Sequence, residues 1–267
     1  MVTIVFWIYL LLFPHIVETE PAENCLRLDS LKGEWLNKKY IETVQLTKSP
    51  RKASEDIYYT AFIILKELDS YTWSQNYNFH EGITYRITGL RPASESNMYQ
   101  IHYEPIYEPE TPKTIERVTY TNIFLIYGKP PINEITWIFK PIYGYPKDEE
   151  QRITFVRVEP NVHDYVNRIV LAGTYTDEKG RIFVFEESGR ARWPDRHFDY
   201  KIGLDFVFSE SNFIMILDDR DERGIPQTYG FEWRDNKLLI FKGKYSEESG
   251  FNEFVREDNP VYILTPR

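Results

Sequence analysis

One short stretch of the chain carries residue types that could do acid–base chemistry. Asp195, His197 and Asp199 lie close together in the sequence, just after Trp193. A neighbouring carboxylate orients an imidazole and tunes its pKa for proton transfer. A hydrolase or isomerase that uses His197 with Asp195 or Asp199 is therefore one hypothesis. The sequence locates no further partner for these residues, so a structural role is the more frequent outcome.

Other signatures of chemistry are absent from the sequence. It contains no Gly-x-Ser-x-Gly, no glycine-rich phosphate loop and no His-Glu-x-x-His. The run from Asp218 to Gly224 is similar to a calcium-binding loop. However, Arg223 stands where that loop needs an oxygen ligand, and the later glutamate is missing. We therefore expect no metal and no cofactor, and an enzyme is the less favoured class.

Aromatic side chains are the better candidates for a binding site. The chain has 20 Tyr, 17 Phe and 6 Trp. Such residues line apolar ligand pockets, although core packing is their more frequent use. In a barrel, inward side chains either fill the interior or line a cavity. The candidates for ligand contact are Trp73, Tyr85, Tyr103, Trp193, Tyr229 and Trp233.

The elements that carry these aromatic residues have the pattern of β-strands. Ile83, Tyr85 and Ile87 alternate with Thr84 and Arg86, which is typical of a strand with one buried face. Similar short segments follow one another, and consecutive strands joined by short turns usually pair as antiparallel neighbours. Closing such a meander into a barrel removes its exposed edges. We predict an all-β fold of antiparallel meander barrels.

Two short helices are expected among the strands. Leu36, Tyr40 and Val44 form one apolar stripe, with Asn37 as the cap, and Ser49-Pro50 ends this helix. The second helix covers residues 162–170, with Asn161 as its N-cap. Its apolar positions follow the same helical spacing.

A short motif occurs twice and divides the chain. Leu31-Lys32-Gly33-Glu34-Trp35 opens one series of strands, and Leu171-Ala172-Gly173-Thr174-Tyr175 opens another. We predict two similar halves after a leader of residues 1–24. The first β-domain covers residues 25–160, and the second covers residues 161–267 and begins with the second helix. Residues 161–267 are expected to fold when expressed alone.

Gly33 and Trp35, at the start of an antiparallel meander, resemble the Gly-x-Trp of the lipocalins and fatty-acid-binding proteins, the calycin group. The second half matches more loosely, with Gly173 and Tyr175. The resemblance implies that Trp35 closes one end of a barrel and does not touch ligand. It also implies that a ligand lies nearer the barrel middle, where Trp73, Tyr85 and Tyr103 are expected. Chains of this style look like proteins of the bacterial envelope.

The first residues indicate export. The run from Ile4 to Phe13 is apolar and has the length of a signal-peptide core. It is too short to span a bilayer, which needs roughly 20 apolar residues. Cys25, the single cysteine, lies just beyond it and resembles the lipidated cysteine of bacterial lipoproteins. The alternatives are a lipid anchor at Cys25 and an incidental thiol in a leader.

Charge and motifs together define the expected function. The net charge is -9, and the basic residues form no cluster, which excludes a nucleic-acid surface. We expect an exported, non-enzymatic β-barrel protein that binds a small apolar ligand or a surface partner. We expect it to be either secreted or held in the cell envelope by a lipid anchor. The alternatives are a structural or interaction module with filled barrels, and the enzyme that uses His197.

Overall fold

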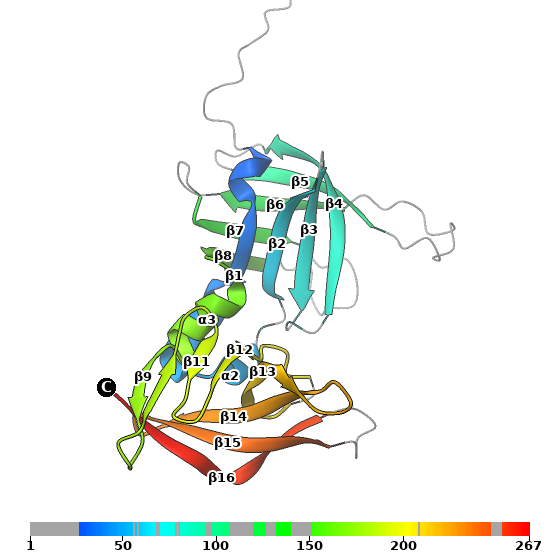
Figure 1. The fold of residues 1–267 in the computed structure, drawn as a ribbon. Coiled ribbons are helices and arrows are strands. Elements are labelled where there is room, and N and C mark those ends of the chain that lie inside the picture. The colour runs from blue at the N-terminus through cyan, green and yellow to red at the C-terminus, as the bar shows by residue number, and fades with distance from the viewer. Residues whose placement is uncertain are drawn as a thin grey trace, which may run out of the picture.

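The chain forms two antiparallel β units, one beyond the other, with helices between them (Figure 1). The structure is a computed structural model. It describes residues 27–55, 57, 59–67, 70–77, 79, 81–93, 98–106, 120–126, 132–139, 151–207, 209–246 and 253–267. The apolar run at residues 4–13 and Cys25 lie outside these residues. Among the described residues, no helix is long and apolar enough to cross a bilayer.

The first unit is a closed barrel in which each strand pairs with the next in sequence. The ring closes where the last strand pairs with the first, with Glu34 opposite Val158. A single 3-10 turn, η1 (Leu28–Leu31), precedes it. Its strands are β1 (Gly33–Asn37), β2 (Tyr59–Glu67), β3 (Ser70–Tyr77), β4 (Glu81–Pro92), β5 (Met98–Pro105), β6 (Tyr120–Ile126), β7 (Glu134–Phe139) and β8 (Gln151–Val158).

The second unit is a curled sheet with the same sequential pairing. Its two outer strands meet through a short ladder only, Thr265 opposite Thr176 and Pro266 opposite Tyr175. The prediction of an all-β antiparallel meander is therefore confirmed. The strands are β9 (Gly173–Thr176), β10 (Ile182–Phe185), β11 (Arg190–Arg192), β12 (His197–Ile202), β13 (Asn212–Arg220), β14 (Pro226–Arg234), β15 (Lys237–Ser246) and β16 (Glu253–Pro266).

The described residues form three short helices, one more than the sequence predicted: α1 (Lys38–Thr47), α2 (Pro50–Ser54) and α3 (Val162–Val170). Both expected caps form: Asn37 Oδ1 accepts from the Lys39 amide at 2.9 Å, and Asn161 Oδ1 accepts from the Asp164 amide at 2.9 Å. The helix α2 was missed because Ser49-Pro50 was interpreted only as a stop. Proline also suits the first turn of a helix, where its missing N–H costs nothing, and here it begins α2.

The repeated motif has the same geometry in both halves. Gly33 and Gly173 both have positive φ, 127° and 158°, which favours glycine at this position. The Trp35 indole donates to the Leu31 carbonyl at 2.9 Å. In the second half, the Tyr175 hydroxyl donates to the Leu171 carbonyl at 2.7 Å. Each half thus begins with an aromatic side chain bonded to the backbone four residues earlier.

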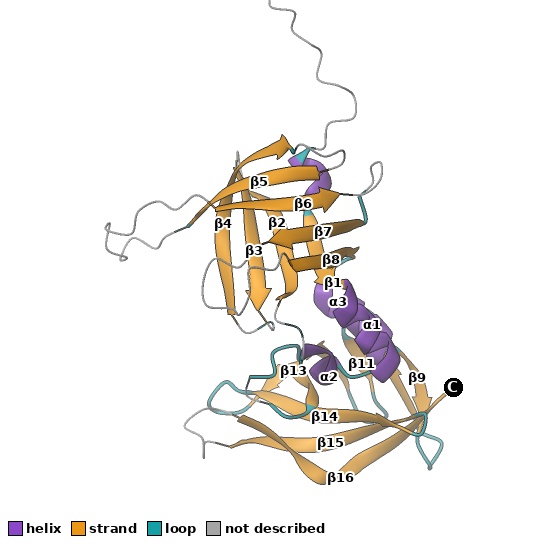
Figure 2. Ribbon diagram, turned by 180° about the vertical axis from the view of Figure 1, so that it is seen from behind, coloured by secondary structure: helices purple, strands orange, loops and turns teal. Residues whose placement is uncertain are grey.

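The helices α1 and α3 lie between the two β units (Figure 2). Buried residues of α1, α2 and α3 belong to the same apolar cluster as the interior of the second unit, and we call this cluster the shared core. It also includes Leu36 of β1, Ala61 of β2 and Val158 of β8. The helices that connect β1 to β2 therefore cover the second unit. The division at residue 160 stays a prediction, but the shared core extends across it.

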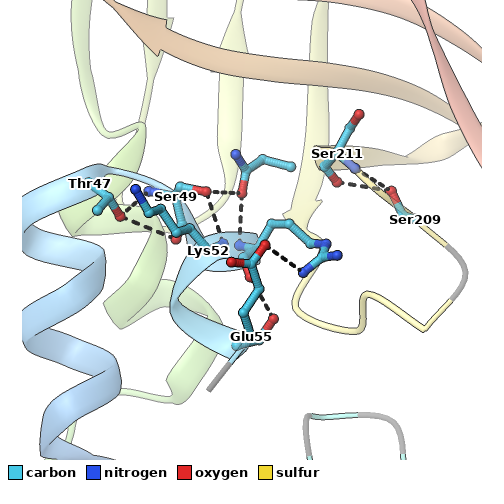
Figure 3. A network of polar contacts seen from close by, with 9 residues as sticks. Thr47, Ser49, Lys52, Glu55, Ser209 and Ser211 are labelled. Atoms are coloured by element: carbon cyan, nitrogen blue, oxygen red, sulfur yellow. Dashed lines mark hydrogen bonds and ion pairs between the residues drawn. The ribbon is translucent and has the colours of Figure 1, made fainter. Parts of the chain in front are cut away.

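Hydrogen bonds to β13 and to α3 hold the segment of α1 and α2 in place. Asn212, at the start of β13, accepts from the Arg51 amide at 2.9 Å and contacts Ser49 Oγ at 3.1 Å, beside the Ser209–Ser211 turn (Figure 3). Lys48 Nζ donates to the Ile169 carbonyl, 2.8 Å away, near the end of α3. These bonds join segments far apart in sequence, so α1 and α2 are held in place against the second half of the chain.

One buried amide ties α3 to the second unit. Asn167 is 2% exposed, and its Nδ2 donates to the carbonyls of Glu186 and Glu187 at 2.8 and 3.1 Å. Its Oδ1 accepts from the Tyr200 hydroxyl at 2.7 Å. Buried polar groups contribute to stability only when they are hydrogen-bonded. Asn167 therefore fixes how α3 lies on β12 and on the turn after β10.

Candidate functional site

The three ligand candidates of the first barrel come together, but they pack against one another. The Trp73 ring lies 5.7 Å from Tyr85 and 5.0 Å from Tyr103, and the two tyrosine rings are 4.7 Å apart. The Trp137 ring is 5.6 Å from Trp73. Trp73 and Tyr103 are buried. These contacts describe aromatic packing in the barrel core, with ring separations typical of protein interiors.

Two candidates of the second unit also meet, around a cation of the chain itself. The rings of Trp193 and Tyr229 are 5.3 Å apart. The Arg196 guanidinium lies 5.1 Å from the Trp193 ring and 5.4 Å from the Tyr229 ring, and it donates to the Tyr229 hydroxyl at 2.8 Å. Such cation–π contacts are favourable. The two rings therefore contact each other, and Arg196 packs against both of them.

Trp233 is not part of either aromatic group. Its indole donates to the Val170 carbonyl at the end of α3, 2.9 Å away, and its ring lies 6.1 Å from Tyr175. The structure therefore places Trp233 at the junction of α3 with the second unit. Here it caps a helix carbonyl, because the last carbonyls of a helix lack partners within the helix.

The acid–base group does not assemble. His197 and Asp199 are exposed along β12, while Phe198 and Tyr200 between them are buried. Asp195 is exposed as well. In the described part of the chain, no hydrogen bond joins His197 to either carboxylate. The same residues hold no cluster of His, Cys, Asp and Glu suited to a metal ion.

A pocket of about 400 Å³ lies on β13 and is the strongest candidate for a binding site. We call it the β13 pocket. This volume is within the range of small-molecule sites. Its lining comes from the turn after β3, from α3, from the segment after β12 and from the four strands β12, β13, β15 and β16. The residues are Phe79, His163, Lys201, Gly203, Leu204, Asp205, Phe213, Met215, Tyr245 and Phe254.

The apolar side of the β13 pocket is an aromatic cluster separate from the shared core. The Phe213 ring lies 5.9 Å from Phe206 and 5.5 Å from Phe254, and Phe254 lies 5.9 Å from Tyr245. Gly203 makes room for this cluster, because a Cβ at that position would overlap the Phe213 ring. Gly243 does the same for Phe254. The two glycines thus allow a concave aromatic surface.

The polar side of the β13 pocket consists of His163, Lys201 and Asp205. His163 Nδ1 lies 3.2 Å from the Ile202 carbonyl. Burial, together with the charge of Lys201, lowers the pKa of His163 to about 4, so its imidazole is neutral near pH 7. Asp205 Oδ1 accepts from the Val207 amide at 3.1 Å. The pocket therefore offers a few polar groups beside an apolar wall.

None of the predicted ligand residues lines the β13 pocket. One signal in the sequence could have revealed it. Phe213-Ile214-Met215-Ile216 is apolar on both faces of a strand, and only Ile214 and Ile216 belong to the shared core. A strand that is apolar on both faces needs a second apolar neighbour or a ligand. The remaining lining residues are scattered along the chain, so no local pattern groups them.

A second, larger pocket of about 710 Å³ lies beside β1 and α3. Three of its charged residues, Glu34, Arg157 and Arg168, have structural partners. Glu34 accepts from the Val162 amide at 2.6 Å and so caps α3, and Arg168 bonds Glu187 at 2.7 Å. Arg157 lies 4.8 Å from the Trp35 ring and donates to the Ser30 carbonyl. This pocket therefore marks where the first barrel meets α3.

The chain was also compared with known proteins. No model of a protein family, no curated protein and no solved structure matches it.

Proposed function

We propose that this chain is an exported, non-enzymatic binding protein that holds a small apolar ligand in the β13 pocket. The observation that carries the proposal is the concave aromatic surface of Phe213, Phe254 and Tyr245 with only a few polar groups beside it. Pockets that are mostly apolar, with a small number of placed polar groups, are typical of small-molecule sites. The separation of His197 from both neighbouring carboxylates argues against the enzyme hypothesis.

We further propose that both halves are calycin-like. The support is the buried Trp35 at the start of a closed antiparallel barrel and the matching bond of Tyr175 in the second half. In this proposal the ligand does not enter the barrel interior near Trp73, Tyr85 and Tyr103. The aromatic packing there and the position of Arg196 over Trp193 favour a site outside the two interiors.

A structural or interaction module with filled barrels is the second candidate. It is favoured by the close aromatic packing around Trp73 and around Trp193. Native mass spectrometry of protein purified from its own source separates the two candidates. A co-purifying apolar molecule supports the binding protein, and protein without any bound molecule supports the module.

Filling the β13 pocket should weaken binding. Met215→Trp places a larger side chain in the pocket, and we expect it to weaken binding of the apolar fluorophore N-phenylnaphthylamine by about tenfold or more. Fluorescence titration measures the dissociation constant. Leu217→Trp is the matched control, because Leu217 lies two residues along β13 and is 42% exposed. Equal binding by both variants would contradict this site.

Lipid attachment is tested at Cys25, and the proposal includes a lipid anchor there. Cys25→Ser should move the protein from the membrane fraction to the soluble fraction, because a thioether-linked lipid can no longer form. Cell fractionation followed by immunoblotting measures the change. Ser30→Ala, beyond the leader, serves as the control. Membrane association that persists in Cys25→Ser would argue for an incidental thiol.

A further inference from the structure

The polar groups of the β13 pocket restrict what its occupant can be, and the inference below rests on the proposed binding function. The Ile202 carbonyl can only accept a hydrogen bond, so the nitrogen beside it, His163 Nδ1, must be the donor. In a neutral imidazole the other nitrogen, Nε2, then carries a lone pair and can only accept. No described residue donates to His163 Nε2.

Lys201 supplies the complementary group. Its ammonium has no ion-pair or hydrogen-bond partner among the described residues, and it lines the same pocket as His163. The two are close enough for the Lys201 charge to disfavour protonation of the imidazole. An ammonium can only donate hydrogen bonds. The lining of the pocket therefore includes one donor and one acceptor that have no partner among the described residues.

Charge argues against an ionic occupant. The lining carries one charge of each sign, Lys201 and Asp205, so it has no net charge to offset the cost of desolvating an ionic ligand. A neutral hydroxyl satisfies both free groups, because its oxygen accepts and its hydrogen is donated. An aldehyde or an ether could use Lys201 only, because neither has a hydrogen to donate.

We propose that the β13 pocket binds an apolar alcohol, with the hydroxyl between Lys201 and His163 and the hydrocarbon part against Phe213 and Phe254. The hydroxyl oxygen accepts from the Lys201 ammonium, and the hydroxyl hydrogen is donated to His163 Nε2. The aromatic cluster accounts for affinity, and the pair of polar groups accounts for the choice of functional group.

The test compares two isomers that differ only in the donor. n-Decanol and methyl nonyl ether have the same atoms and nearly the same length, but the ether has no O–H. Displacement of N-phenylnaphthylamine from the wild-type protein should show that n-decanol binds about fivefold more tightly, the effect of one hydrogen bond. Decanoate and decylamine should both bind more weakly than n-decanol.

Two variants assign the effect to the named groups. In His163→Leu the preference for n-decanol over the ether should disappear. In Lys201→Met both compounds should bind more weakly while the preference stays, because both oxygens accept from the ammonium. Lys201 is exposed, so Lys201→Met should fold. If His163→Leu does not fold, the comparison of n-decanol with the ether on the wild-type protein still tests the inference.

Three results would overturn the inference. The first is equal binding of the two isomers by the wild-type protein. The second is a preference that persists in a folded His163→Leu variant. Both leave the binding function intact, because the fluorophore still binds. The third is failure of the fluorophore itself to bind the wild-type protein, which overturns the proposed function as well.

Discussion

Trp35→Ala should lower the free energy of unfolding by about 3–5 kcal/mol, the usual cost of truncating a large buried aromatic side chain. Trp35 is fully buried in the first barrel and stacks on Phe62 at 5.7 Å. The substitution also removes the indole that donates to Leu31 and the ring that packs against Arg157. Urea denaturation followed by circular dichroism measures the change.

The second half offers a matched, smaller substitution. Tyr175→Phe keeps the buried ring and removes only the hydroxyl that donates to the Leu171 carbonyl. We expect a loss of about 1 kcal/mol, the usual contribution of one hydrogen bond. If Trp35→Ala lowered the free energy of unfolding by no more than Tyr175→Phe does, the barrel end would tolerate a cavity. In that case Trp35 would not be the side chain that closes it.

Local features of the fold were predictable because their causes are local. Asn37 and Asn161 cap helices through hydrogen bonds to amides two and three residues away, and the apolar stripes of α1 and α3 follow from helical spacing. The alternation along β4 indicates which face is buried: Ile87 is buried, whereas Thr84 and Arg86 are exposed. Gly33 and Gly173 were recognised by spacing alone, and the structure gives both a positive φ.

Long-range features were not predictable from the same patterns. The stripe of Tyr40 and Val44 shows that α1 has an apolar face, but it does not show which barrel covers that face. The sequence order suggests the first half, whereas the structure places these residues in the shared core. In the same way, Arg196 comes from the turn before β12, and nothing near it in sequence indicates that it lies over Tyr229.

The candidate site shows the same limit. Its lining residues come from positions between 79 and 254, so only the three-dimensional fold brings them together. Trp73 and Trp193 were chosen from the sequence because large aromatic residues, in strands where apolar and polar residues alternate, point into a barrel. That reasoning identifies inward residues well, but it does not separate a filled interior from a cavity.

The shared core leads to the second large effect, which concerns the coupling of the two halves. Val44 of α1 is fully buried in the shared core, which also contains the interior residues of the second unit. Val44→Asp places a carboxylate there without a partner, and we expect it to lower the free energy of unfolding by about 3–5 kcal/mol. Leu46→Asp on the same helix is the control. Leu46 is 86% exposed, and its substitution should change stability by about 0.5 kcal/mol or less.

Amide hydrogen exchange identifies which strands lose protection in Val44→Asp. In Val44→Asp the amides of β9 to β16 should exchange faster, although the substitution lies in the connection between β1 and β2. The physical reason is that α1 covers the apolar interior of the second unit, so a displaced α1 exposes that interior to water. For the same reason, and contrary to the expectation from the sequence, residues 161–267 expressed without α1 and α2 should aggregate or remain unfolded. Faster exchange confined to β1–β8 in Val44→Asp, or a cooperatively folded fragment of residues 161–267, would show that each half folds on its own core.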